Sequence, residues 1–142
     1  MTEQRLDNLV RIGKLKAEPP SRTELEGLRC SGGRRLRDAE NSALSLDSRF
    51  DLAYNPAHAL APAALRWHGY RSGNRYLVFQ SLAHTVALPD EQWRVLDQAH
   101  RKRNLTEYEG DVDVDEALVE ATVRVAREVE ARVAALAPPE KD

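Results

Sequence analysis

Apolar residues recur every three or four positions along most of this chain, and this spacing is typical of amphipathic helices. No alternating apolar and polar pattern, which would indicate a strand, extends beyond a few residues. The helical spacing is found in segments at about 6–13, 21–43, 46–68, 75–88, 89–109 and 113–136. The sequence therefore predicts an all-α bundle of four to five helices, with a short N-terminal helical arm in front of it.

Proline and capping signals divide the chain into three parts. The dipeptide Pro19-Pro20 should stop any helix that begins upstream. The next residues, Ser21-Arg-Thr-Glu24, match the capping box that often opens a helix. We therefore expect an N-terminal arm and linker at 1–20, a helical domain at 21–137, and a frayed tail at 138–142.

Glycines and prolines also occur inside two of the predicted helices. Gly32 and Gly33 together cost about 2 kcal/mol of helix propensity, so this point is either weak or a place where a neighbouring helix packs closely. Pro56 and Pro62 each remove one backbone hydrogen bond from the segment 46–68. Because the apolar stripe stays in phase across both prolines, we expect a bend there and not a break.

Composition argues against several classes of protein. The net charge is −2 at pH 7, so any nucleic-acid binding must come from a local basic patch. Cys30 is the single cysteine, which rules out an internal disulfide or a cysteine-based zinc site and fits a reducing compartment. No apolar run approaches the length of a membrane helix, and the polar start does not resemble a signal peptide. We expect a cytoplasmic protein that contacts no membrane.

Motifs for metals, nucleotide phosphates and serine nucleophiles are missing from the sequence. The 4 histidines form no pair at the spacing of a helical zinc site. The chain contains neither a Walker A loop nor a GxSxG elbow. We therefore expect no metal and no cofactor.

The stretch Gln98–Gly110, QAHRKRNLTEYEG, concentrates positive charge in a predicted helix. At about 100° per residue, His100 and Arg103 continue the buried stripe that begins at Trp93. A desolvated arginine needs a partner, because an unpaired buried charge is costly. Either Glu107 or another acid pairs with Arg103, or the stripe opens into a groove where an anion or a second subunit supplies the partner.

Two further polar lines accompany that stripe. The first, on the same helix, contains Asp97, Arg101, Asn104 and Tyr108. The second, on the segment 46–68, contains Asp51, Asn55 and His58. A histidine at the border of a buried face can serve as a general base or a base-stacking group. His58 can equally be satisfied by a backbone carbonyl, including one freed by a proline.

The arrangement resembles HEPN domains, the nucleotide-binding family of higher eukaryotes and prokaryotes. Their signature is an Arg, usually followed by a polar residue, and then a His after four to six intervening residues, near the end of a late helix. Here Arg103-Asn104 precedes LTEYEG and a capped last helix, and SRFDLAYNPAHALAPAALRWHGYR is similar to the family's long second helix. The resemblance covers roughly residues 22–136, and it implies a homodimer.

The chain departs from the family motif at one position, because Tyr108 stands where the motif has His. In active HEPN ribonucleases, Arg and His from two subunits meet at the RNA backbone without metal. A tyrosine, with an ordinary pKa of about 10, is a poor base at neutral pH. The resemblance implies catalytic candidates Arg103, Tyr108, His58 and His100, and a nucleotide- or phosphate-binding set of Arg101, Lys102, Arg103, Asn104, Asn55 and Asp51.

Three functions follow as hypotheses. The first is a HEPN-like module that binds nucleotide, RNA or a partner protein in a toxin–antitoxin or related stress or defence system. A nucleotidyltransferase-type antitoxin would be its partner, and Tyr108 a candidate for modification. The second is a metal-independent endoribonuclease toxin that acts at a cleft between two subunits. The third is a structural, dimerising bundle with an internal arginine–acid network.

Overall fold

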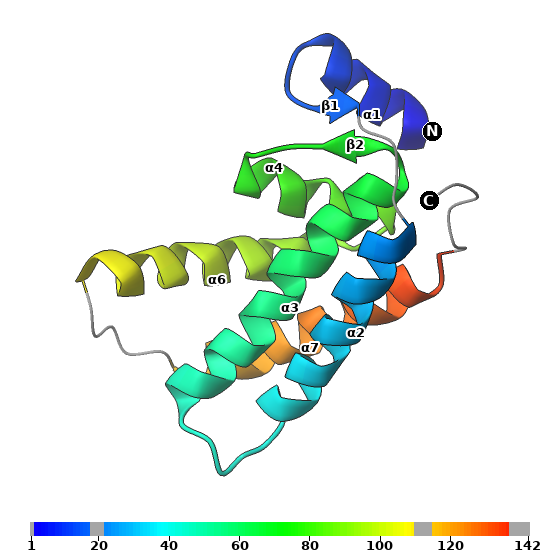
Figure 1. The fold of residues 1–142 in the computed structure, drawn as a ribbon. Helices are drawn as coiled ribbons and strands as arrows, with labels where there is room; N and C mark the ends of the chain where they lie inside the picture. The colour runs from blue at the N-terminus through cyan, green and yellow to red at the C-terminus, as the bar shows by residue number, and fades with distance from the viewer. Residues whose placement is uncertain (1, 18–21, 110–114, 137–142) are drawn as a thin grey trace.

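The computed structural model describes residues 2–17, 22–109 and 115–136, and it confirms the all-α prediction (Figure 1). The elements in chain order are α1 (Thr2–Arg11), β1 (Lys16–Ala17), α2 (Arg22–Ala39), α3 (Leu46–Trp67), β2 (Tyr70–Arg71), α4 (Arg75–Gln80), α5 (Leu82–Thr85), α6 (Asp90–Glu109) and α7 (Glu116–Ala134). Within these ranges, no helix is both long and apolar enough to cross a membrane.

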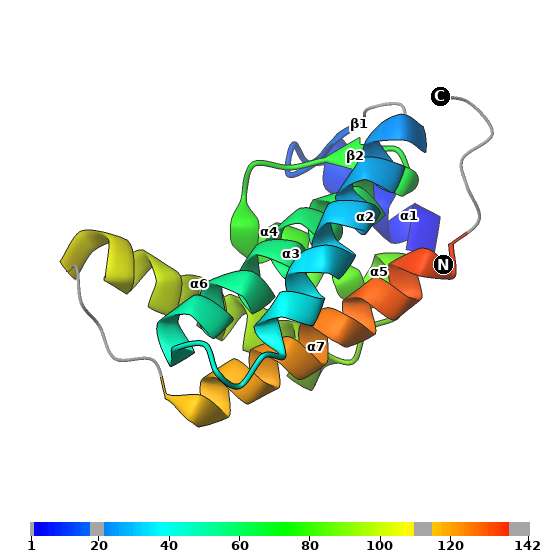
Figure 2. The same cartoon turned by 60° about the horizontal axis from the view of Figure 1, so that its bottom comes forward.

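Helix α3 forms the centre of the bundle and packs against both α2 and α7 (Figures 1 and 2). Its buried face is rich in alanine, with Ala53, Ala57, Ala61 and Ala64 all fully buried. Small side chains let neighbouring helix axes approach, while Leu60 and other large residues fill the space between them. Helix α6 crosses on the other side and contacts α4, α7 and α3.

Prolines and glycines lie inside two of the packed helices, α3 and α2. Pro56 and Pro62 both lie inside α3, which continues without a break from Leu46 to Trp67. A Cβ atom added at Gly32 would lie 3.4 Å from the Cδ1 atom of Leu60. One added at Gly33 would lie 2.9 Å from a carboxylate oxygen of Glu130. Of the two alternatives at these glycines, the structure favours close packing, by side chains of α3 at Gly32 and of α7 at Gly33.

The segment 75–88 was predicted as one helix, but the structure divides it at Ser81 into α4 and α5. The Ser81 hydroxyl donates to the carbonyl of Val78 at 2.6 Å, so it bonds locally at the end of α4. The last helix, α7, begins at Glu116, and the side chain of its N-cap Asp115 accepts from the backbone N–H of Leu118. The first two residues of the predicted segment 113–136 lie outside the described residues.

Arg49 joins three helices near the start of α3. It is buried, and its Nε donates to the carbonyl of Ala39 at the end of α2, at 2.8 Å. Its Nη2 donates to Glu120 of α7 at 3.0 Å. Because a buried guanidinium must be hydrogen-bonded, these contacts fix the three helix ends relative to one another.

The N-terminal arm is attached to the bundle through a small sheet that the sequence did not predict. Strands β1 and β2 are antiparallel, with Lys16 opposite Arg71 and Ala17 opposite Tyr70. The Tyr70 hydroxyl donates to Asp7 of α1. Leu6 and Leu15, both in the arm, are buried in the same core cluster as the bundle residues. The division of the chain at residue 20 stays a prediction.

Candidate functional site

Polar residues of α3 and α6 meet where the two helices cross. Asp51, Tyr54 and Asn55 come from α3, and His100, Arg103 and Asn104 come from α6; we call these six residues the α3–α6 cluster. They meet because Asp51, Tyr54 and Asn55 share one side of α3, and His100, Arg103 and Asn104 are three or four positions apart on α6.

Tyr54 and His100 form the buried centre of the cluster. Tyr54 is only 2% exposed, and its hydroxyl oxygen lies 2.8 Å from Nδ1 of His100. The amide nitrogen of Asn104 faces Nε2 of His100 at 3.4 Å. An amide nitrogen can only donate, so this contact favours the neutral tautomer in which Nε2 accepts and the Nδ1–H donates to the Tyr54 oxygen. Both nitrogens of His100 are therefore engaged by neighbouring side chains.

Arg103 lies at the edge of the cluster, with 29% of its side chain exposed. Its Nη1 donates to the side-chain oxygen of Asn55 at 2.8 Å. The nearest carboxylate oxygen of Asp51 is 3.9 Å from Nη1, on a side chain that is 57% exposed. The guanidinium carbon also lies 5.3 Å from the ring centroid of Tyr54, in cation–π range. Asp51, an acid other than Glu107, is thus next to Arg103. This is the first of the two alternatives from the sequence, in which an acid of the same chain pairs with Arg103.

The other bases of the run face elsewhere. Arg101 is 73% exposed and pairs with Asp97 of the previous turn at 2.5 Å. Arg101 and Lys102 line a cavity of about 460 Å³ between α6 and the start of α7, together with Asp115. The structure therefore does not bring Arg101 and Lys102 together with Arg103, because successive residues of a helix point about 100° apart.

The remaining predicted catalytic residues are His58 and Tyr108. The His58 ring lies 5.6 Å from that of Tyr54, one turn earlier on α3, and is half-buried. It is therefore adjacent to the cluster. The side chain of Tyr108 lies outside the described residues, as does that of Glu107, and their roles stay predictions. Among the residues described, no three His, Cys, Asp or Glu side chains are grouped so that they could hold a metal ion.

Tyr54 is the cluster residue that the sequence analysis did not single out. A signal was available, because a tyrosine on a buried helix face usually needs a hydrogen-bond partner for its hydroxyl. Its ring also packs against Phe50 and Phe79, at centroid distances of 6.2 and 6.4 Å. These aromatic contacts fix the orientation of the hydroxyl that faces His100.

Comparison of this chain with protein-family models, with curated proteins and with solved structures gave no match. The resemblance to HEPN domains therefore stays a prediction from the sequence. The fold and the geometry define an all-α bundle with a polar cluster between two helices. In that cluster an arginine lies at the rim and a histidine lies behind it.

Proposed function

We propose that this protein is a cytoplasmic, HEPN-like module that binds a nucleotide or a short RNA segment through the α3–α6 cluster. The observation that carries the proposal is the position of Arg103. Its guanidinium lies over the Tyr54 ring and donates to the Asn55 side chain, which orients it. The Arg103 side chain is still 29% exposed. A planar guanidinium fork held in this way matches the oxygens of a phosphate group.

The nearby carboxylate does not remove this capacity. Asp51 is more than half exposed and 3.9 Å from Arg103. Exposed ion pairs of this kind contribute only about 0–1 kcal/mol. A phosphate, which offers charged oxygens in the plane of the fork, can therefore displace Asp51 from Arg103. The Asp51 side chain would then turn toward solvent, and the amides of Asn55 and Asn104 are close enough to orient the ligand.

The contacts of both ring nitrogens of His100 favour binding over cleavage. A general base needs a ring nitrogen directed at the substrate proton, whereas the two nitrogens of His100 face Tyr54 and Asn104. In this proposal the protein forms a homodimer and has a nucleotidyltransferase-type antitoxin as its partner, in a toxin–antitoxin or related stress or defence system. The resemblance to HEPN domains is the support for those partners.

The test is the binding of a fluorescently labelled single-stranded RNA, followed by anisotropy at several salt concentrations. Arg103→Ala should weaken binding by roughly 5- to 100-fold and reduce its salt dependence by about one phosphate contact. Arg124→Ala, on the exposed face of α7, removes the same charge outside the cluster and should have little effect. Equal losses in the two variants would show that only net charge matters and would contradict the proposal.

Metal-independent cleavage of RNA is the second candidate, because His100 and Arg103 lie one turn apart on the same face of α6. In such a reaction the ribose 2′-oxygen bonds to phosphorus, its proton moves to a base, and the bond to the 5′-oxygen breaks as that oxygen gains a proton. Incubation of RNA with the purified protein and a chelator separates the two functions. Cleavage that Arg103→Ala abolishes would replace the binding proposal with this one.

A structural role is the third candidate, and the contacts of Arg103 with Asn55 and Asp51 favour it. A double-mutant cycle for Arg103 and Asp51 measures their coupling in the free energy of unfolding. The binding proposal expects a coupling below about 1 kcal/mol, since the pair is exposed and its atoms are 3.9 Å apart. A larger coupling, together with no RNA binding at low salt, would favour the structural role.

A further inference from the structure

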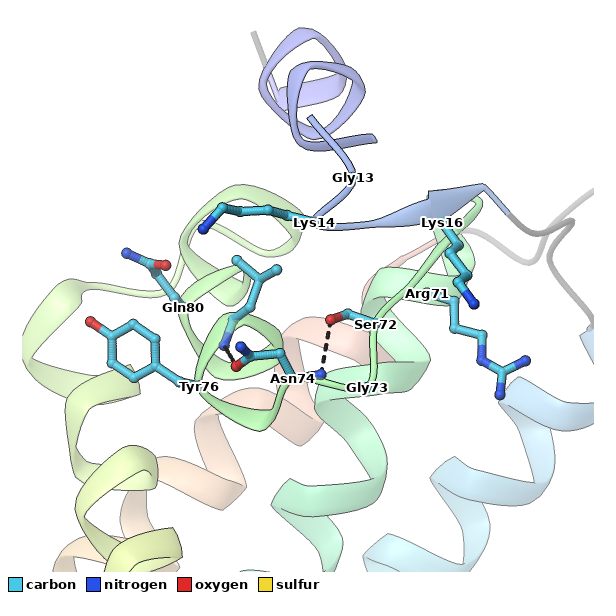
Figure 3. Close-up of a pocket in the computed structure, with 10 residues that line it drawn as sticks. Gly13, Lys14, Lys16, Arg71, Ser72, Gly73, Asn74, Tyr76 and Gln80 are labelled. Atoms are coloured by element: carbon cyan, nitrogen blue, oxygen red, sulfur yellow. Dashed lines mark hydrogen bonds between the residues drawn. The ribbon is translucent and has the colours of Figure 1, made fainter. Parts of the chain in front are cut away.

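A second polar site lies outside the α3–α6 cluster, between the turn that follows α1 and the loop that joins β2 to α4 (Figure 3). It is a cavity of about 720 Å³. The side chains that line it include Lys14, Lys16, Arg71, Tyr76 and Gln80, and we call it the basic pocket. The volume is within the range of about 300–1,000 Å³ that small-molecule sites occupy.

Three cations, Lys14, Lys16 and Arg71, are among the described residues that line the basic pocket, and no carboxylate is among those described residues. Lys16 and Arg71 are also directly opposite each other in the β1–β2 pair. In a chain whose net charge is −2, this local concentration of cations matches an anionic ligand.

The pocket has two chemically different ends. Figure 3 shows Lys16 and Arg71 together at one end, and Lys14 with Gln80 and Tyr76 at the other. Tyr76 is 47% exposed, although its ring makes an edge contact with Trp93 at a centroid distance of 5.7 Å. A ring held in this way offers a surface on which a flat ligand ring can stack.

The loop that separates the two ends is held by its own hydrogen bonds. The Ser72 hydroxyl accepts from the backbone N–H of Asn74 at 3.1 Å, and the Asn74 side chain accepts from the N–H of Leu77 at 3.1 Å. On the opposite wall, Gly13 adopts a φ of 80° in the turn before β1. A loop that is ordered before binding loses less conformational freedom when a ligand enters.

We propose that the basic pocket binds a mononucleotide, with its phosphates between Lys16 and Arg71 and its base on Tyr76. Lys14 neutralises further negative charge near the Tyr76 end, and Gln80 supplies an amide that can hydrogen-bond the edge of the base. This site is independent of the α3–α6 cluster, since none of its residues belongs to that cluster. The two proposals can therefore succeed or fail separately.

The test is isothermal titration calorimetry of the full chain with AMP, ATP, inorganic phosphate and a nine-residue single-stranded RNA as separate titrants. Lys16→Ala and Arg71→Ala should each weaken ATP binding by roughly 10- to 100-fold, because each removes a charge-assisted contact. Tyr76→Ala should weaken ATP and AMP binding by roughly 5- to 100-fold, whereas Tyr76→Phe, which keeps the ring, should bind normally.

A steric variant tests the location without changing any charge. A Cβ atom added at Gly73 meets no atom within 4 Å, and the position has no positive φ. Gly73→Leu should therefore fold normally, as circular dichroism can verify, while its side chain can enter the pocket and block the ligand. Arg35→Ala, on the exposed face of α2, is the matched charge control and should bind ATP as the parent chain does.

Several outcomes would overturn this proposal. One is no nucleotide binding at roughly 1 mM, and another is ATP affinity that is unchanged in Lys16→Ala and Arg71→Ala. Inorganic phosphate that binds as tightly as ATP would show that Tyr76 has no role in binding. RNA that binds much more tightly than ATP would show that the ligand is an RNA strand and not a mononucleotide. ATP binding that is lost only in Arg103→Ala would assign the ligand to the α3–α6 cluster and leave the proposed function standing.

Discussion

Replacing Tyr54 with phenylalanine removes one oxygen atom from the centre of the α3–α6 cluster. The change leaves the aromatic ring, its packing against Phe50 and its position under Arg103. The 2.8 Å hydrogen bond to His100 is lost, and the Nδ1 atom of a half-buried imidazole loses its partner. A net hydrogen bond contributes about 0.5–1.5 kcal/mol, and an unsatisfied buried donor or acceptor costs about 1–3 kcal/mol. We expect Tyr54→Phe to lower the free energy of unfolding by about 1–2 kcal/mol.

Urea denaturation followed by tryptophan fluorescence measures this change. With a slope of about 2 kcal/mol per molar urea, the midpoint should fall by about 0.5–1 M while the slope stays constant. Tyr76→Phe is the matched control, because that side chain is largely exposed, and it should be nearly neutral. A loss below about 0.5 kcal/mol for Tyr54→Phe, or no coupling to a second substitution at His100, would refute the hydrogen-bond reasoning.

Three further predictions concern the stability of the bundle, and the same urea assay checks each. Arg49→Met should lower the free energy of unfolding by about 2–4 kcal/mol, because it removes a buried hydrogen-bonding charge. Glu120→Gln leaves that guanidinium in place and should cost less than about 1 kcal/mol. Similar losses in both variants would contradict this reasoning. Leu6→Ala should cost about 2–5 kcal/mol in one cooperative transition, and an unchanged transition would show that the arm is independent of the core. Gly27→Ala should stabilise α2 by about 0.5–1 kcal/mol, since the new methyl group meets no atom within 4 Å, and Gly33→Ala should gain less because a carboxylate oxygen is 2.9 Å away.

The helices were predictable because their signals are local. The apolar stripe at 46–68 predicted the long helix, and α3 runs from Leu46 to Trp67 with Ser45 as its N-cap. Its prolines cost two backbone hydrogen bonds, but burial of the continuous stripe outweighs that loss. The pair β1–β2 was not predictable in the same way. Two-residue strands are too short to show a periodic pattern. The pairing of these two depends on the tertiary burial of Leu15 and Tyr70.

The site was predictable up to the point where two helices must be placed against each other. A helical wheel is enough to turn His100 and Arg103 inward and to set Arg101 apart from them. It contains no information on the register between α3 and α6, which decides that Tyr54 meets His100 and that Asn55 meets Arg103. That register follows from the packing of the whole core, so these partners could not be read from either segment alone.

The pairing of β1 with β2 also bears on the order in which the chain folds. Ala17 must find Tyr70 across about fifty intervening residues, and closing a loop of that length costs about 3.5 kcal/mol of chain entropy beyond a constant. That cost is recovered only after α2 and α3 have docked and brought the two strands together. We expect the arm to join last during folding and to open first in hydrogen exchange. Because β1 forms one wall of the basic pocket, a ligand there would hold the arm closed and slow the exchange of its amides.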